Sequence, residues 1–105
     1  MRFGPFDFNV QTRKLKRDER EIPLDERSAA LLKLLVDNRD RSVSKEEILR
    51  CIGPASGFPD DRVFHRIWVL RRLLGEYASD GNYIVTVPKQ GYRFIAGDHD
   101  RLLAS

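Results

Sequence analysis

The spacing of the apolar residues changes twice along this chain, and that change limits the folds open to it. Phe6, Phe8 and Val10 alternate with polar residues, which is the period of a strand with one buried face. From about residue 25 to residue 74 the apolar residues recur every three or four positions, as they do on amphipathic helices. A period of two returns after residue 83. The chain therefore predicts an α+β domain with a sheet first, then helices, then a hairpin.

The N-terminal residues predict a small antiparallel sheet. Behind the first strand comes a charged run, residues 13–20, whose only apolar side chain is Leu15, and we interpret this run as a turn. A short strand near Ile22–Leu24 then closes the sheet. A basic arm that binds nucleic acid is the weaker interpretation of the run, because Asp18 and Glu19 interrupt its positive charge.

Asp25 marks the start of the first helix. Its side chain is of a type favoured at an N-cap, and Glu26 behind it suits the positive end of the helix dipole. The helical spacing extends to about residues 36–38, where we expect the helix to end. Its apolar face is expected to consist of Ala30, Leu31, Leu34 and Leu35.

A second, shorter helix begins with a capping box. Ser44 and Glu47 have the S-x-x-E spacing in which each side chain accepts a hydrogen bond from the other residue's backbone N–H. Gly53 and Pro54 end this helix. Val43, directly before the cap, is expected to add a short extended pairing.

The third helix, from about residue 61 to residue 74, is the most basic part of the chain. Its buried stripe is expected to be Val63, Ile67, Leu70 and Leu74, which recur at helical spacing. Residues 62–72 hold Arg62, Arg66, Arg71 and Arg72 and no carboxylate, whereas the whole chain has a net charge of only +3 and an isoelectric point near 9.3. The global charge therefore understates a local basic face.

Other side chains of this helix have more than one interpretation. Phe64 and Trp68 share a flank, and we expect them to pack against the first helix or the hairpin, with a partner-binding patch as the alternative. Arg71 lies nearer to the apolar stripe. For it we favour packing, a salt bridge or a phosphate contact over base reading.

A hairpin follows the third helix. Tyr83–Val87 and Tyr92–Ile95 are rich in β-branched and aromatic residues, and Pro88, Lys89, Gln90 and Gly91 form the turn between them. The second helix, its following loop and the third helix resemble a helix-turn-helix with a lengthened turn. The hairpin then corresponds to a wing.

Four segments in this order resemble the OmpR/PhoB-type effector domains of bacterial regulators. They are FGPFDFNVQTRKLKRDEREIPL at the start, SVSKEEILRCIG in the second helix, IWVLRRLLG in the third helix and YIVTVPKQGYRFI in the hairpin. The V-P-K-x-G-Y form of the hairpin is most similar to the ToxR/CadC-type branch. The resemblance covers about residues 3–97 and implies a winged helix-turn-helix with a four-stranded N-terminal sheet, three helices and a β-hairpin wing.

The resemblance implies sequence-specific binding of double-stranded DNA by the output domain of a bacterial transcription regulator. The helix at 61–74 would lie in the major groove and the wing at 83–95 in the minor groove. The DNA contacts are expected from Arg62, His65, Arg66, Val69 and Arg72 on the helix, from Lys89, Gln90 and Arg93 on the wing, and from Ser44 and Lys45 at the start of the second helix. In this family an arginine is common where Val69 stands, and a small or polar residue where Phe64 stands.

The resemblance also implies partners beyond DNA. The loop at residues 53–60 would contact RNA polymerase. Homodimer formation on DNA is compatible with the resemblance, but the sequence leaves the oligomeric state open. A receiver upstream, or a membrane span and sensor downstream, would complete the regulator, with this segment in the cytoplasm and without membrane contact. The alternative is a winged helix that binds proteins and has little affinity for DNA, since Phe64, Trp68 and Val69 make the third helix unusually apolar for a groove reader.

The residues that several classes of function require are absent from this sequence. Cys51 is the single cysteine, so an internal disulfide and a multi-cysteine zinc site are excluded, and we expect a small buried or half-buried side chain. His65 and His99 are too isolated for a metal site, and no motif for nucleophilic catalysis or phosphate-binding loop is present. We therefore expect neither an enzyme nor a cofactor. Residues 1–97 are expected to form the domain, and residues 98–105 a flexible tail or linker.

Overall fold

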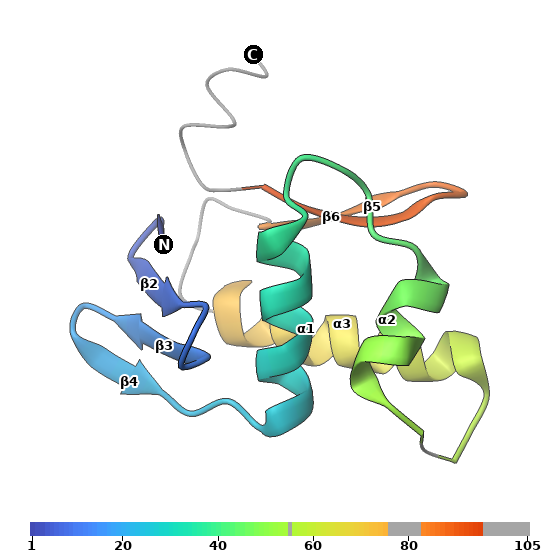
Figure 1. The fold of residues 1–105 in the computed structure, drawn as a ribbon, viewed down its shortest axis with the longest axis horizontal. Coiled ribbons are helices and arrows are strands. Elements are labelled where there is room, and N and C mark those ends of the chain that lie inside the picture. The colour runs from blue at the N-terminus through green and yellow to red at the C-terminus, as the bar shows by residue number, and fades with distance from the viewer. Residues whose placement is uncertain (55, 76–82, 96–105) are drawn as a thin grey trace.

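The computed structural model describes residues 1–54, 56–75 and 83–95, and they contain the predicted sheet, helices and hairpin in the predicted order (Figure 1). The elements are β1 (Arg2–Phe3), β2 (Phe6–Asn9), β3 (Lys14–Arg17), β4 (Arg20–Ile22), α1 (Glu26–Asp37), α2 (Lys45–Ile52), α3 (Pro59–Gly75), β5 (Ile84–Val87) and β6 (Gly91–Phe94). The α+β winged-helix prediction is thereby confirmed. The expected tail at residues 98–105 lies outside the described residues.

The N-terminal sheet has four antiparallel strands in the order β1-β2-β3-β4. The interpretation of residues 13–20 as a turn was wrong, because β3 lies within this run and pairs with both neighbours. Leu15 faces Phe8 on one side and Ile22 on the other, and its side chain is fully buried. The alternation of buried and exposed residues that predicts a strand is hard to recognise here, because Leu15 is the single apolar residue among charged ones. The neighbouring strand is Arg20–Ile22 and so begins earlier than predicted.

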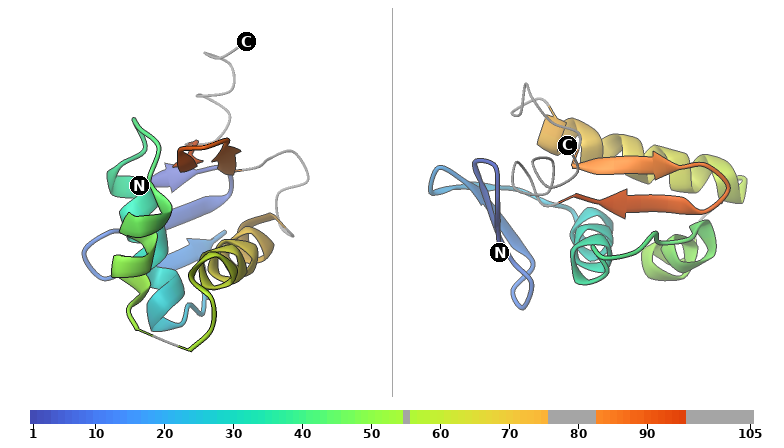
Figure 2. Two further views of the ribbon diagram at one scale, coloured as in Figure 1. Left: turned by 90° about the vertical axis from the view of Figure 1, so that its right-hand side faces the viewer. Right: turned by 90° about the horizontal axis from the view of Figure 1, so that it is seen from above.

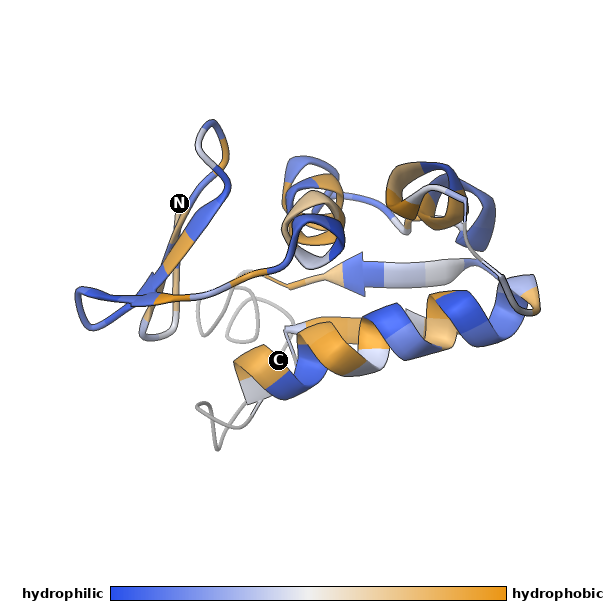
Figure 3. Cartoon of the chain, turned by 90° about the horizontal axis from the view of Figure 1, so that it is seen from below, coloured by the Kyte–Doolittle hydropathy of each residue, from blue (hydrophilic) through white to orange (hydrophobic). Residues whose placement is uncertain are grey.

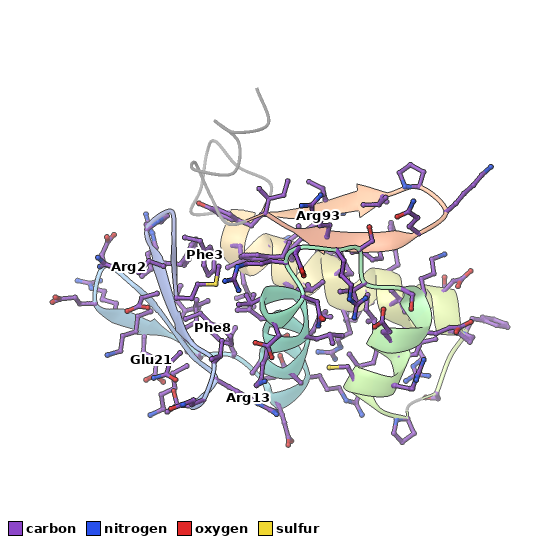
Figure 4. All side chains as sticks on the ribbon, turned by 45° about the horizontal axis from the view of Figure 1, so that its top comes forward. Arg2, Phe3, Phe8, Arg13, Glu21 and Arg93 are labelled. Carbon is purple, nitrogen blue, oxygen red and sulfur yellow. The ribbon has the colours of Figure 1, made fainter. Side chains whose placement is uncertain are left out.

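Charges of alternating sign cross the outer face of this sheet. Arg2 faces Asp7, Asp7 faces Lys16, and Lys16 faces Glu21 on successive strands. Figure 4 shows Arg2 and Glu21 on the side of the sheet away from α1, whereas Phe3 lies on the side of the core. Opposite charges on adjacent strands stabilise a pairing by about 0.2–1 kcal/mol, which helps to explain why this charged segment forms strands.

Helix α1 packs against α2, α3 and β6 and buries a broad face. Its buried residues are Ser28, Ala29, Leu31, Leu32, Leu35 and Val36, so the predicted face was partly wrong: Ala30 and Leu34 are only half-buried. The face that α2, α3 and β6 contact is turned around the helix from the predicted one, toward Ser28 and Leu32, so that Leu34 lies at its edge and Ala30 outside it. Asp25 occupies the N-cap position as predicted, but its side chain makes no capping hydrogen bond.

Helix α2 begins with the predicted capping box. The Ser44 hydroxyl accepts a bond from the Glu47 backbone N–H at 3.2 Å, and the Glu47 carboxylate accepts one from the Ser44 backbone N–H at 2.8 Å. Arg41 also donates to this carboxylate at 2.7 Å. Two hydrogen bonds lower the pKa of Glu47 to about 2. The one from Arg41 has the larger effect, and the one from the Ser44 backbone N–H has the smaller.

Helix α3 lies along one side of the domain, and α1, α2 and the strand pair all lie to the same side of it (Figures 2 and 3). Its buried residues are Val63, Ile67, Leu70 and Leu74, as predicted. Phe3, Tyr83 and Phe94 join the N-terminal sheet to the base of the strand pair, because the ring centre of Phe3 lies 5.1 Å from that of Tyr83 and 5.0 Å from that of Phe94. Among the described helices, none has the length and apolar character needed to cross a bilayer.

Candidate nucleic-acid interface

One face of α3 remains uncovered by the rest of the domain. Between Asp61 and Arg72 its exposed residues are Asp61, Phe64, His65, Trp68 and Arg72, and we call them the outer stripe. They recur at i, i+3, i+4, i+7 and i+11 and lie opposite the buried residues of the same helix. In Figure 3 this helix runs along one edge of the domain, with α1 and α2 on the opposite side. A helix with one packed and one open face is the arrangement that a groove-binding helix requires.

Of the five residues predicted to contact DNA from α3, only His65 and Arg72 belong to the outer stripe. Arg66 lies on the flank toward α1, where its Nη1 atom is 2.7 Å from Oδ2 of Asp25. The side chain of Arg66 is 20% exposed and that of Asp25 is 54% exposed. Ser28 and Arg66 hold the pKa of the Asp25 carboxyl below its ordinary value. Val69 is half-buried on the same flank.

Arg62 also lies on this flank, and its guanidinium donates to the backbone carbonyl of Gly53. Arg27 of α1 donates to the next carbonyl, that of Pro54, at 3.2 Å. These two arginines therefore hold the start of the loop between α2 and α3. Because α3 begins at Pro59, this loop is shorter than the predicted span of 53–60.

Phe64 and Trp68 do not pack against α1 or the hairpin, so that prediction was wrong. Phe64 is 66% exposed and Trp68 is 52% exposed. The Trp68 ring stacks on His65, with 6.2 Å between ring centres and 21° between planes, and the Cζ atom of Arg72 lies 5.2 Å from the Trp68 ring centre. Their positions around the helix, about a quarter turn or more from the centre of the buried stripe, were the signal that could have indicated exposure.

Arg71 packs against the hairpin, in agreement with the prediction for this residue. Its Nε atom donates to the carbonyl of Ile84 at 3.1 Å, and its Nη2 atom to the hydroxyl of Thr86 at 2.9 Å. Its guanidinium also lies over the ring of Tyr92, at 5.7 Å from the ring centre. Arg71 therefore ties β5 to α3.

We call β5, β6 and their turn at residues 88–90 the wing. The predicted pairing of Val43 is present: Val43 and Tyr92 exchange two backbone hydrogen bonds, of 2.6 and 2.9 Å. Beside this bridge Gly91 has a φ of +138°, and a Cβ atom at this position would lie 2.0 Å from the Val43 carbonyl oxygen. A glycine is therefore required where the wing crosses the segment before α2.

The three wing residues predicted to contact DNA have different surroundings. Lys89 is exposed in the turn and has a φ of +67°. Gln90 is also exposed, and its Oε1 atom accepts a hydrogen bond from the Ser42 hydroxyl at 3.2 Å. Arg93 lies on β6, away from the turn, and donates to the Arg39 carbonyl at 3.4 Å (Figure 4).

An open groove of about 570 Å³ separates the wing from the starts of α2 and α3. Lys45, Phe64 and Lys89 are among the residues that line it, together with the capping residue Ser44. The Nζ atom of Lys45 lies 3.7 Å from Oδ1 of Asp60, and both side chains are mostly exposed. The groove thus brings residues of the helix, the wing and α2 to one side of the domain.

Positive charge predominates on α3 and the wing. Residues 59–75 and 83–95 contain six arginines and lysines and two carboxylates, an excess of four positive charges, against +3 for the whole chain. Within the described ranges no three His, Cys, Asp or Glu side chains are grouped closely enough to hold a metal ion. Cys51 is half-buried as predicted, and desolvation raises the pKa of its thiol.

Comparisons with known proteins agree on one group of relatives. The family model described as "Transcriptional regulatory protein, C terminal" matches residues 19–94. The DNA-binding domain of E. coli CadC is 26% identical, with 90% of each chain covered and a TM-score of 0.75. The RstA DNA-binding domain of Klebsiella pneumoniae, solved with the RstA box, is 21% identical over 91% of this chain and 96% of that one, with a TM-score of 0.74. The E. coli CpxR DNA-binding domain is 20% identical, with 91% and 95% covered and a TM-score of 0.74.

Proposed function

The chain belongs to the family of C-terminal domains of transcriptional regulatory proteins, as its resemblance to OmpR/PhoB-type effector domains predicted, and from this premise we propose that it binds double-stranded DNA sequence-specifically. It acts as the output domain of a bacterial regulator, and this role belongs to no class of enzyme. Helix α3 lies in the major groove and the wing in the neighbouring minor groove. The observation that carries this proposal is the uncovered face of α3 beside a basic wing.

The dimensions support this arrangement. An α-helix with its side chains is about 10–12 Å wide, and the major groove of B-form DNA is about 12 Å wide. Lys89, at the turn of the wing, gains from the negative potential of the minor groove. The similar RstA domain was solved together with its DNA box, which supports DNA as the partner of this fold.

The contacts support different roles for the predicted DNA-binding residues. We propose that Arg72 and His65 on the outer stripe and Lys89 on the wing contact DNA, because their side chains are exposed. A DNA contact by Arg66 would require it to leave Asp25, and one by Arg62 would require it to leave the carbonyl of the α2–α3 loop. We therefore assign these two arginines to positioning α3 against α1 and the loop.

The family resemblance supports two further partners. The loop between α2 and α3 would contact RNA polymerase, since Arg27 and Arg62 hold its first two residues in place. A second copy would bind an adjacent half-site, as dimers of helix-turn-helix proteins do. Both events take place where the bacterial chromosome lies, in the cytoplasm.

Binding to duplex DNA at two salt concentrations tests the proposal. The 105-residue chain is titrated into a promoter duplex selected for binding and into a random duplex. We expect tighter binding to the selected duplex and a loss of affinity at higher salt, because released counterions contribute to binding. Absence of binding to either duplex at low salt would contradict the proposal.

A protein-interaction module is the second candidate function. The exposure of Phe64 and Trp68 favours it, because large apolar side chains on an open helix face are common at protein interfaces. The same titration separates the two candidates. A folded chain that binds no duplex at low salt would favour the protein-interaction module.

A further inference from the structure

Three large apolar side chains are exposed in the described part of the chain, and two of them share the outer stripe of α3. Phe64 and Trp68 are four residues apart, so they lie on one face of the helix. The third, Phe58, lies in the loop before α3 and is 77% exposed. Apolar surface in contact with water is unfavourable, and a pair on one helix face indicates a binding surface that covers it.

The indole of Trp68 contacts two other residues of the outer stripe. His65 stacks on one part of it, and Arg72 makes a cation–π contact with it. A side chain held in this way loses little rotamer entropy when a partner covers it. Trp68 is thus prepared for a contact on the open face of α3.

Resting on the proposed role of α3 as the groove helix, we propose that Phe64 and Trp68 recognise C5 methyl groups of thymine. The base edges in the major groove present hydrogen-bond donors and acceptors, and the thymine methyl is the apolar exception among them. An aromatic ring against the N4 amino group of cytosine would leave that donor without a partner, which is unfavourable. The outer stripe therefore selects thymine and disfavours cytosine.

The spacing of the two rings defines the site further. Four residues of α-helix rise by about 6 Å, which corresponds to about two base-pair steps of 3.4 Å. The two recognised thymines therefore lie within about two or three base pairs of each other. Lys45 and Lys89 line the same groove as Phe64, and Arg72 contacts the ring of Trp68. Cations that suit phosphates therefore border both rings, which favours DNA over a protein partner.

Replacement of thymine by uracil tests this proposal, because uracil lacks only the C5 methyl and keeps the same base pairing. A preferred duplex is first selected from a random library with the 105-residue chain. Its thymines are then replaced one at a time, and the dissociation constants are measured by fluorescence anisotropy. We expect about fourfold weaker binding at each contacted position, as for the loss of one buried methyl group. 5-Methylcytosine at the same position should bind more tightly than cytosine.

Alanine variants assign the effect to the two rings. Phe64→Ala and Trp68→Ala should each bind the thymine and uracil duplexes equally at the position that the removed ring contacted. Phe58→Ala is the matched control, since it removes an exposed aromatic outside the outer stripe and should retain the fourfold difference. Equal binding of thymine and uracil duplexes by the parent, or a difference that persists in both stripe variants, overturns the proposal while DNA binding stands. Failure to select any duplex overturns the proposed function, and this proposal with it.

Discussion

Replacement of Arg66 by alanine should reduce stability and leave DNA binding unchanged. The Nη1 atom of Arg66 lies 2.7 Å from Asp25 Oδ2, so the substitution breaks an ion pair between α3 and the start of α1. Exposed pairs contribute about 0.2–1 kcal/mol, and solvent reaches Asp25. Arg66 itself is only 20% exposed and also loses packing of its aliphatic stem, which places the cost at the upper end of this range, about 1 kcal/mol.

The loss can be measured as a change in Tm. For a domain of this size a cost of about 1 kcal/mol lowers Tm by about 4–8 °C. Arg72→Ala is the matched control on the same helix, because it removes an arginine from the outer stripe. We expect it to weaken binding by about 1–3 kcal/mol if the arginine reads a base.

Asp25→Asn provides the second arm of a double-mutant cycle. Asp25→Asn should lower the free energy of unfolding less in the Arg66→Ala variant than in the parent, because the ion pair is already broken in that variant. The pKa of Asp25 is lowered in the folded chain, so its stabilisation is complete above the ordinary value of 3.8 and is lost as the pH falls below it. The reasoning is refuted if Arg66→Ala has the Tm of the parent and loses as much DNA affinity as Arg72→Ala.

Three further predictions concern other parts of the domain. The pKa of Glu47 is about 2 rather than 4.5, so Glu47→Gln should have a lower Tm than the parent at neutral pH. The difference in Tm should shrink as the pH falls from 4.5 to 2, and a constant difference would contradict this. Lys89→Ala should reduce the slope of log K against log salt by about 0.9, one phosphate contact, whereas an unchanged slope in binding isotherms would remove the wing from the interface. Ile67→Ala should cost about 2–5 kcal/mol in urea unfolding, because its side chain is fully buried, and a parent-like midpoint would mean that this site tolerates the cavity.

Local patterns in the sequence were sufficient for most of the fold. The capping box of Ser44 and Glu47 and the buried stripe of α3 depend on residues three or four apart, and both are present as predicted. Strand β3 was missed because Leu15 alone indicated its period, and its pairing depends on apolar residues of two other strands. Without knowledge of those two strands, the charged residues around Leu15 have the composition of a turn.

The candidate site was harder to predict for a related reason. The helical pattern separated the buried stripe of α3 from the rest but gave no partners for the flanking arginines. Arg66 pairs with Asp25, 41 positions away in sequence, and Arg62 bonds the carbonyl of Gly53 across a loop. A helix has two flanks and one outward face, and only the tertiary contacts decide which arginines remain on the outward face. Phe64 and Trp68 were assigned to packing because exposed aromatic residues are uncommon on an isolated domain.

The attachment of the wing at both strands has a mechanical consequence for a bound duplex. Arg71 fixes β5 to α3, and the backbone bridge of Val43 and Tyr92 fixes β6 to the segment before α2. The distance between the groove helix and the turn of the wing is therefore set by the protein. A duplex that receives both must adapt its own minor-groove width and bend to this distance, at a cost that depends on its base sequence. Base pairs between the two contacts, which no side chain touches, would then influence affinity through their stiffness.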